Sequence, residues 1–249
     1  MKPVLGIDIG GSGIKGAPVD LSSGRFIGER HRIATPQPAL TAPVSETVRK
    51  IVEHFPNLSG PIGCTFPGIV ISGRIYTAAN LDDQWIGVDA AEEFSAACGR
   101  PVALINDADA AGLAEARFGA GAGHKGVVLV LTLGTGIGSA LLHNGRLVPN
   151  TELGHLELNG EVIEDQASNR ARKAKGLSFK KWAKVLNRYL AHLDRLFAPD
   201  LVVIGGGISK QFDAFGPRLR CRAEVVPAAL RNQAGIVGAA LWAAGDATG

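Results

Sequence analysis

Cysteine is scarce in this sequence. The 249 residues include only three, Cys64, Cys98 and Cys221, which lie far apart. No two of them have the short spacing of a metal-binding pair, and an odd number cannot all pair in disulfides. Few, widely spaced cysteines are typical of proteins from a reducing compartment. We therefore expect no disulfide framework and a cytoplasmic location.

Long hydrophobic runs and strong charge are also missing. The longest apolar runs, near 127–133 and 235–245, are well short of the roughly 20 residues that span a bilayer. Asp8 lies inside the first apolar run, which argues against a signal peptide. The net charge of +3 does not make the chain a polycation, so nucleic acid is not the expected partner. These absences favour a soluble globular protein with no membrane partner.

Glycine, in contrast, is abundant, with 33 residues, and it follows two similar apolar stretches. VLGIDIGGSG (4–13) and VVLVLTLGTGIG (127–138) align when Asp8 is placed on Thr132 and Gly10 on Gly134. Each is followed by a further apolar run and a turn that contains glycine. Two copies of strand, glycine turn and strand predict two similar lobes that face each other across a cleft.

Strand patterns alternate with helical patterns along the chain, which predicts an α/β protein. The expected smaller lobe comprises 1–110 plus 234–249, because an apolar final helix would pack back on it, and the larger lobe comprises 111–233. A strand is expected over 26–33, ending in the basic cluster Arg30, His31 and Arg32. The clearest helix covers 178–197: Ser178 can cap it, and apolar residues recur along one face from Trp182 to Phe197. Packing of this stripe inside the lobe is favoured over a homodimer interface.

Three glycine turns that follow strands are candidates for binding phosphate, because exposed backbone N–H groups in such turns attract anions. They are formed by Gly10, Gly11, Ser12 and Gly13, by Gly134, Thr135 and Gly136, and by Gly205, Gly206 and Gly207. The spacing Gly11-x-Gly13-x-x-Gly16 also matches a dinucleotide fingerprint. That fingerprint requires a helix to begin inside the motif, whereas 17–20 continue as a strand, so the phosphate interpretation is favoured.

Three polar positions near strand ends have both a structural and a chemical interpretation. Asp8 either bonds the turn that follows it or holds Mg²⁺, directly or through water, beside a phosphate. Asn106 and Asp107 stand where a strand meets a helix, and both residue types cap helices. The chemical interpretation makes Asp107 a general base, since α/β proteins place their sites at the carboxyl ends of strands.

The second half of the chain carries a polar cluster and a basic segment. Glu152, His155 and Glu164 lie on expected loops, where a metal site is one interpretation. Residues 166–193 include eight arginines and lysines and no acid, whereas a solvated helix face usually mixes signs. This asymmetry indicates a polyanion, and a linear phosphate polymer fits better than RNA or DNA beside three phosphate turns. The proposed track consists of Arg170, Arg172, Lys173, Lys180, Lys181 and Lys184.

Together these motifs resemble the ROK sugar kinases. The resemblance rests on Asp8 to Lys15 (DIGGSGIK), Asn106-Asp107, Leu133 to Gly138 (LGTGIG), Glu152 to His155 (ELGH) and Gly205 to Ser209 (GGGIS), in that order. It covers almost the whole chain and implies the two-lobed actin-like, ribonuclease H-like ATPase fold with its active site in an interlobe cleft. Most such kinases carry a cysteine-rich zinc motif soon after ELGH. Here 159–168 contain no cysteine, so no zinc is expected, and the chain is similar to the branch of polyphosphate glucokinases and polyphosphate/ATP glucomannokinases.

The resemblance implies a kinase that transfers a phosphoryl group from polyphosphate, and from ATP, to the 6-hydroxyl of glucose, with mannose as an open second acceptor. It implies that Asp107 deprotonates the hydroxyl and that Mg²⁺ binds near Asp8. The implied sugar ligands are Asn80, Asn106, Asp107, Glu152, His155 and Glu164. The implied phosphate and nucleotide ligands are Lys15, the first two glycine turns, Gly206 and Gly207.

Three other functions share part of this pattern. An ATP-only hexose or acylamino-sugar kinase would share every motif. A sugar-responsive transcription regulator of the same family would need a helix-turn-helix ahead of the first phosphate strand, which starts here at Val4. A nucleic-acid-binding protein would use the basic segment, but it would leave the three phosphate turns without a purpose.

Overall fold

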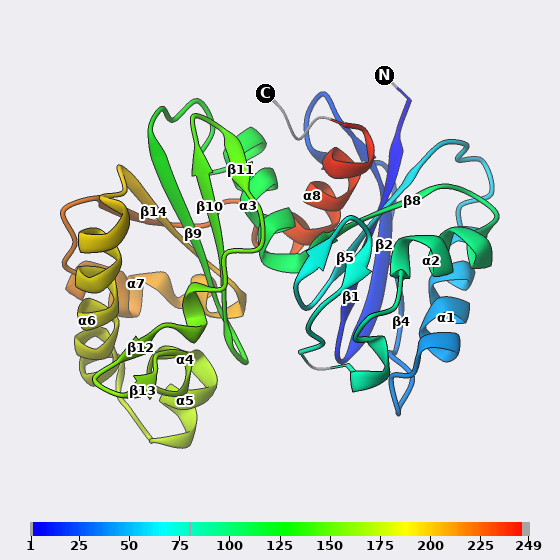
Figure 1. The fold of residues 1–249 in the computed structure, drawn as a ribbon. Helices are drawn as coiled ribbons and strands as arrows, with labels where there is room; N and C mark the ends of the chain where they lie inside the picture. Colours follow the sequence, from blue (N-terminus) through cyan, green and yellow to red (C-terminus); the bar gives the residue numbers. More distant parts are fainter. Residues whose placement is uncertain (1, 80, 246–249) are drawn as a thin grey trace. The chain divides into compact units, whose positions relative to one another are not determined.

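The computed structural model describes residues 2–79 and 81–245 and divides the chain into two compact units (Figure 1). Unit 1 comprises Met1–Ala110 and Gln233–Gly249, and unit 2 comprises Ala111–Asn232. The chain passes from one unit to the other within helix α3 (Asp107–Phe118) and returns within a short 3-10 turn, Arg231–Gln233. No helix in the described ranges is long and apolar enough to cross a membrane.

Unit 1 is built on a sheet in which β1 forms an antiparallel hairpin with β2 and pairs in parallel with β5, which in turn pairs in parallel with β8. Short strands β3 and β4 pair with β2. A separate small hairpin is formed by β6 and β7. The elements are β1 (Val4–Gly10), β2 (Gly13–Asp20), β3 (Arg25–Phe26), β4 (His31–Ile33), α1 (Thr41–Glu53), β5 (Ile62–Phe66), β6 (Val70–Ile71), β7 (Arg74–Ile75), α2 (Ala90–Cys98), β8 (Val102–Asn106) and α8 (Ala234–Ala243).

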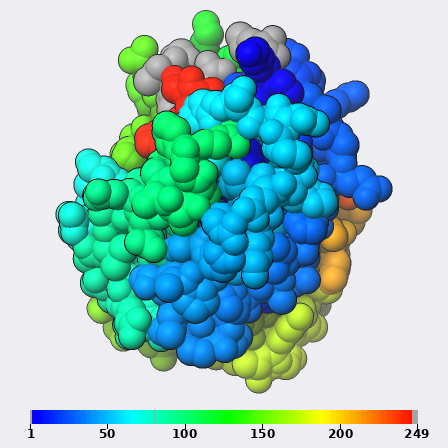
Figure 2. Space-filling view, turned by 90° about the vertical axis from the view of Figure 1, so that its right-hand side faces the viewer, coloured from blue at the N-terminus to red at the C-terminus, as the bar shows by residue number. Residues whose placement is uncertain are grey.

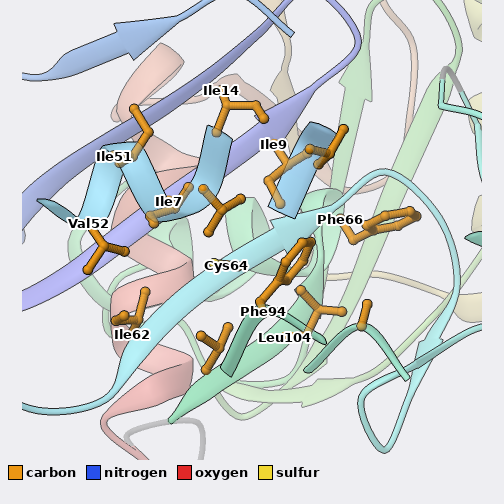
Figure 3. Close-up of a cluster of buried hydrophobic side chains, with 14 of the residues drawn as sticks. Ile7, Ile9, Ile14, Ile51, Val52, Ile62, Cys64, Phe66, Phe94 and Leu104 are labelled. Carbon is orange, nitrogen blue, oxygen red and sulfur yellow. The ribbon is translucent and has the colours of Figure 1, made fainter. Parts of the chain in front are cut away.

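The main core of unit 1 lies between its sheet and helices α1 and α2 (Figure 3). Ile7 and Ile9 of β1, Ile51 of α1 and Phe94 of α2 belong to this one buried cluster. These side chains alternate along the strands and recur at helical spacing along α1, so each element buries one apolar face. The outer surfaces of α1 and α2 form part of the face in Figure 2, coloured blue to blue-green.

Helix α8 packs against β1 and β5 at unusually close range. A Cβ atom at Gly6 would lie 2.0 Å from the carbonyl oxygen of Ile236, and one at Gly63 would lie 1.8 Å from that of Ala239. Only glycine therefore allows the helix backbone to approach the two strands this closely. This helix, whose sequence is uniformly apolar, is grouped with unit 1.

Unit 2 repeats the central pattern of unit 1. Its sheet pairs β9 and β10 as an antiparallel hairpin, and β14 joins β9 in parallel. The two hairpins are the repeat of strand, glycine turn and strand predicted from the sequence, and the structure adds a parallel third strand to each. The elements are β9 (Val127–Leu133), β10 (Ile137–His143), β11 (Arg146–Val148), β12 (Glu157–Leu158), β13 (Glu161–Val162), α4 (Glu164–Ala167), α5 (Asn169–Ala174), α6 (Phe179–Phe197), β14 (Leu201–Gly205), α7 (Phe212–Phe215) and β15 (Glu224–Pro227).

Helix α6 confirms the expected cap and the expected role of its apolar stripe. The Ser178 hydroxyl accepts a hydrogen bond from the backbone N–H of Lys181. Trp182, Leu186 and Tyr189 are fully buried in the core of unit 2. The stripe therefore packs inside its own unit, which was the favoured arrangement.

Two expected elements differ in the structure. The single strand predicted over 26–33 is two short strands that each pair with β2, because Gly28, between them, adopts a left-handed conformation (φ 82°) that interrupts the extended chain. The loop predicted around Glu164 is the start of the short helix α4. Four helical residues are too few for the periodic pattern on which helix prediction depends.

Candidate active site

The first glycine turn joins β1 to β2, and Gly10 is directly opposite Gly13 in the hairpin. Strand β2 begins at Gly13, so no helix starts inside the motif and the dinucleotide interpretation is excluded. Asp8 lies at half-buried depth on β1, where one carboxylate oxygen is 3.2 Å from Nζ of Lys15 and the other accepts a hydrogen bond of 3.1 Å from Thr65 Oγ1. Thr65 also accepts a bond from the N–H of Ile9. The hydroxyl therefore fixes both Asp8 and the strand that carries it.

The surroundings of Asp8 suit a Mg²⁺ ion that takes most of its ligands from a bound phosphate and from water. Mg²⁺ often binds one or two protein carboxylates and completes its shell with phosphate oxygens and water. The described residues include no group of three or more His, Cys, Asp and Glu side chains that would form a full protein cage. A single, half-buried carboxylate beside a phosphate turn fits this mode of binding.

Asn106 and Asp107, the two neighbouring candidates at the end of β8, differ in burial and in hydrogen bonding. Asn106 is 5% exposed, its Oδ1 accepts bonds from the N–H groups of Ala108 and Asp109, and its Nδ2 donates to the carbonyl of Gly68. Asn106 is therefore the helix cap, which was the structural interpretation. Asp107 is exposed, although its Oδ1 also lies 2.9 Å from the N–H of Ala108. It follows the carboxyl end of a parallel strand, where α/β proteins place their ligands.

The second glycine turn joins β9 to β10, and two candidate residues hold it. The N–H of Gly134 donates to the carbonyl of Gly136, and the carbonyl of Gly134 accepts from the N–H of Arg170. Glu164 Oε2 accepts a 2.9 Å bond from the N–H of Ile137, and it would lie 2.5 Å from a Cβ at position 136. Glu164, predicted to bind sugar, thus holds the second glycine turn, a contact that sequence motifs do not reveal.

Glu152 and His155 lie together in unit 2, in and beside a 3-10 turn. His155 Nε2 is 3.9 Å from Glu152 Oε2, and the His155 side chain is 65% exposed. The turn is fixed by Ser139 Oγ, which accepts from the N–H of Leu153, and by the Tyr189 hydroxyl, which donates to the Leu153 carbonyl. Burial raises the pKa of Glu152, and the nearby Glu164 charge adds to the effect while His155 opposes it. The cluster offers paired donors and acceptors, as recognition of sugar hydroxyls requires.

The third glycine turn ends β14. Gly206 has a φ of 77°, and a Cβ there would come within 2.7 Å of the Leu133 backbone. Close packing against β9 therefore accounts for this glycine, whereas Gly207 is exposed and has open space around its Cβ position. Of the two residues assigned to a nucleoside, Gly207 is the accessible one.

The basic segment divides into engaged and exposed side chains. The Arg172 guanidinium lies 4.6 Å from the Phe179 ring centroid, and Arg170 approaches Asp165 at 3.6 Å. Both arginines thus have partners within unit 2. The side chains of Lys173, Lys180, Lys181 and Lys184 are exposed. Within the predicted track, the four lysines are therefore the side chains that are exposed to solvent.

Asn80, the remaining candidate for a sugar ligand, lies outside the described residues.

The architecture of both units, with its paired hairpins and glycine turns, is that of the actin-like (ribonuclease H-like) ATPase fold. The family model described as "ROK family" matches residues 4–169, and the chain belongs to this family. It is 49% identical over 245 residues to polyphosphate glucokinase of Mycobacterium tuberculosis (strain CDC 1551 / Oshkosh), covering 98% of this chain and 92% of that protein.

Two solved structures extend the comparison. Inorganic polyphosphate/ATP-glucomannokinase from Arthrobacter sp. strain KM is 52% identical, with a TM-score of 0.94, covering 99% of this chain and all of the other. A ROK family glucokinase from Streptomyces griseus, in complex with glucose and AMPPNP, is 26% identical, with a TM-score of 0.82, covering 96% of this chain and 98% of that one. Similarity thus extends over nearly the full chain.

Proposed function

We propose that this chain transfers the terminal phosphoryl group of inorganic polyphosphate, and also that of ATP, to the 6-hydroxyl of glucose, giving glucose 6-phosphate. The observation that carries the proposal is the near full-length identity of about one half to relatives named polyphosphate glucokinase and polyphosphate/ATP-glucomannokinase. The name of the second relative supports mannose as a further acceptor. The glycine turns and the exposed carboxylate of Asp107 are the local features that agree with it.

In the proposed reaction, Asp107 accepts the proton of the glucose 6-hydroxyl while the oxygen of that hydroxyl attacks the terminal phosphorus of the donor. The bond from phosphorus to the bridging oxygen breaks, and the shortened polyphosphate or ADP leaves. Glu152, His155 and Glu164 orient the sugar, while the turns at 10–13 and 134–136 and Lys15 hold the transferred group. Mg²⁺, held by Asp8 and the donor, would neutralise phosphate charge. Positioning and charge neutralisation are the main demands of this chemistry.

The proposal is tested by initial rates of glucose 6-phosphate formation with long-chain polyphosphate and with ATP at matched phosphoryl concentration, with and without Mg²⁺. Turnover with both donors that requires Mg²⁺ is expected. Turnover with ATP alone would leave a ROK hexokinase without polyphosphate activity. No product with either donor would overturn the assignment to glucose.

Replacing Lys180, Lys181 and Lys184 together with glutamine is expected to raise the KM for long-chain polyphosphate by about tenfold at low salt, because three exposed cations on one helix attract a polyanion. The KM for ATP should change much less. Steady-state kinetics with both donors provides the measurement, and the effect should shrink as salt screens the charges. The triple lysine-to-arginine variant keeps the charges and should behave like the parent. Equal loss with both donors would remove these lysines from the track.

Replacing Glu152 with glutamine is expected to weaken glucose binding and to stabilise the protein at neutral pH. The folded-state pKa of Glu152 is raised above its ordinary value of 4.5, mainly by burial, so stability is lost as pH rises through the folded pKa. A neutral amide avoids this cost, and the gain should vanish below the unfolded-state pKa. Thermal unfolding at several pH values measures the difference. Glu157→Gln, at an exposed neighbour, is the control, and equal effects of the two changes would contradict the prediction.

A further inference from the structure

The segment 31–37 holds the backbone of the first glycine turn. Nη2 of Arg32 donates a 2.8 Å hydrogen bond to the Ser12 carbonyl. Thr35 Oγ1 donates to the carbonyl of Gly10, and Gln37 Nε2 lies 3.3 Å from that of Gly11. Three consecutive carbonyl oxygens of the turn thus receive donors from one short segment. Carbonyl oxygens repel phosphate, so covering them makes the turn a more favourable anion site.

Charge is arranged in a row across three strands beside this turn. Asp8 of β1 is opposite Lys15 of β2, and Lys15 is opposite Arg32 of β4. Directly opposite residues of antiparallel strands project to the same face. Lys15 is paired with Asp8, but no carboxylate of the described residues lies within 4.0 Å of the Arg32 guanidinium. Two cations directly opposite each other destabilise a sheet, and a bound anion beside them would remove the repulsion.

The Arg32 guanidinium lies close to the turn, in space that a side chain at Gly13 would fill. A Cβ at Gly13 would lie 2.7 Å from both Nε and Nη2 of Arg32. Glycine at position 13 therefore makes room for the guanidinium. Arg32 is exposed, and only one of its N–H groups is needed for the Ser12 carbonyl. A guanidinium has five N–H donors in a planar fork, which suits a pair of phosphate oxygens.

We propose that Arg32 is a binding residue for the phosphoryl donor, whose phosphate oxygens it contacts beside the first glycine turn. Thr35 and Gln37 are positioning residues that act through the turn backbone. The identity of the donor as polyphosphate or ATP rests on the proposed function, whereas the anion site rests on the geometry of unit 1 alone. The site extends the phosphate ligands beyond the glycine turn and Lys15, and no sequence motif indicates it.

The test uses inorganic tripolyphosphate as the probe and the full-length chain without sugar, so that no turnover occurs. Isothermal titration calorimetry would compare the parent with Arg32→Gln, Arg32→Lys and the control Arg30→Gln. Arg30 is a neighbouring exposed arginine outside the row of charges. Loss of a charge-assisted bidentate contact is expected to weaken tripolyphosphate binding by about tenfold or more in Arg32→Gln. Arg32→Lys should fall between the parent and Arg32→Gln, and Arg30→Gln should resemble the parent.

Glucose binding, followed by tryptophan fluorescence, reports whether unit 1 is damaged more generally. Weaker tripolyphosphate binding with unchanged glucose binding supports the assignment. Equal loss of both ligands, an effect no larger than that of Arg30→Gln, or a parent chain that does not bind tripolyphosphate overturns it. The proposed function is tested separately. If the parent binds tripolyphosphate through Arg32 but forms no glucose 6-phosphate, the anion site is supported and the proposed kinase activity is contradicted.

Discussion

Replacing Asp107 with asparagine is expected to lower kcat for glucose phosphorylation by about 10²- to 10⁴-fold, the usual contribution of a general base. The amide has nearly the same shape but does not take up the hydroxyl proton at neutral pH. Glucose binding should change little, because the side chain retains a hydrogen-bonding group at the end of β8. Rapid-quench measurement of glucose 6-phosphate, with glucose affinity from calorimetry, separates the two effects.

A matched control for this change is Asp213→Asn, which removes an exposed carboxylate from α7. It should leave kcat and the glucose affinity unchanged. Asp107→Asn that retains most of the parent kcat would exclude Asp107 as the base. A large loss of glucose affinity at unchanged kcat would make Asp107 a sugar ligand without a role in proton transfer.

Replacing Glu115 with alanine is expected to destabilise the protein by about 3–5 kcal/mol, because it leaves three backbone N–H groups without their acceptor. Glu115 is 1% exposed, and its carboxylate accepts hydrogen bonds from Ala120, Ala229 and Leu230 at 2.7–3.0 Å. This cost is a large part of the 5–15 kcal/mol that stabilises most proteins. Urea unfolding followed by circular dichroism measures it.

Glu115→Gln retains one acceptor oxygen and places a donor against another donor, so its loss should fall between that of alanine and the parent. Glu46→Ala is the control, since Glu46 pairs with Arg49 on the exposed surface of α1 and contributes little. A cost for Glu115→Ala no greater than that for Glu46→Ala would show that other groups or water satisfy the three N–H groups.

Local patterns in the sequence were sufficient for the features that depend on neighbouring residues. The hairpin at 4–20, the Ser178 cap and the buried stripe of α6 follow from alternation, capping chemistry and helical spacing. The glycine turns were found because each follows an apolar strand. All of these signals lie within about 20 residues, the scale on which periodicity operates.

Contacts between distant residues were not predictable in this way. Thr65 bonds Asp8 across β5 and β1, and Glu115 bonds residues more than 100 positions away. A threonine in a strand or a glutamate in a helix is ordinary by itself, and only the fold reveals its partner. The break at Gly28 was missed because a single left-handed residue decides it, and glycine adopts both hands readily.

The return of α8 to unit 1 has a consequence for how the chain folds during synthesis. Unit 2 is continuous in sequence, whereas unit 1 needs residues from both ends of the chain. As the chain leaves the ribosome, β1 and β5 emerge before unit 2, whereas the helix that covers Gly6 and Gly63 emerges after it. Unit 1 is thus completed only after unit 2 has been synthesised, and one face of its sheet stays exposed to aggregation until α8 has emerged.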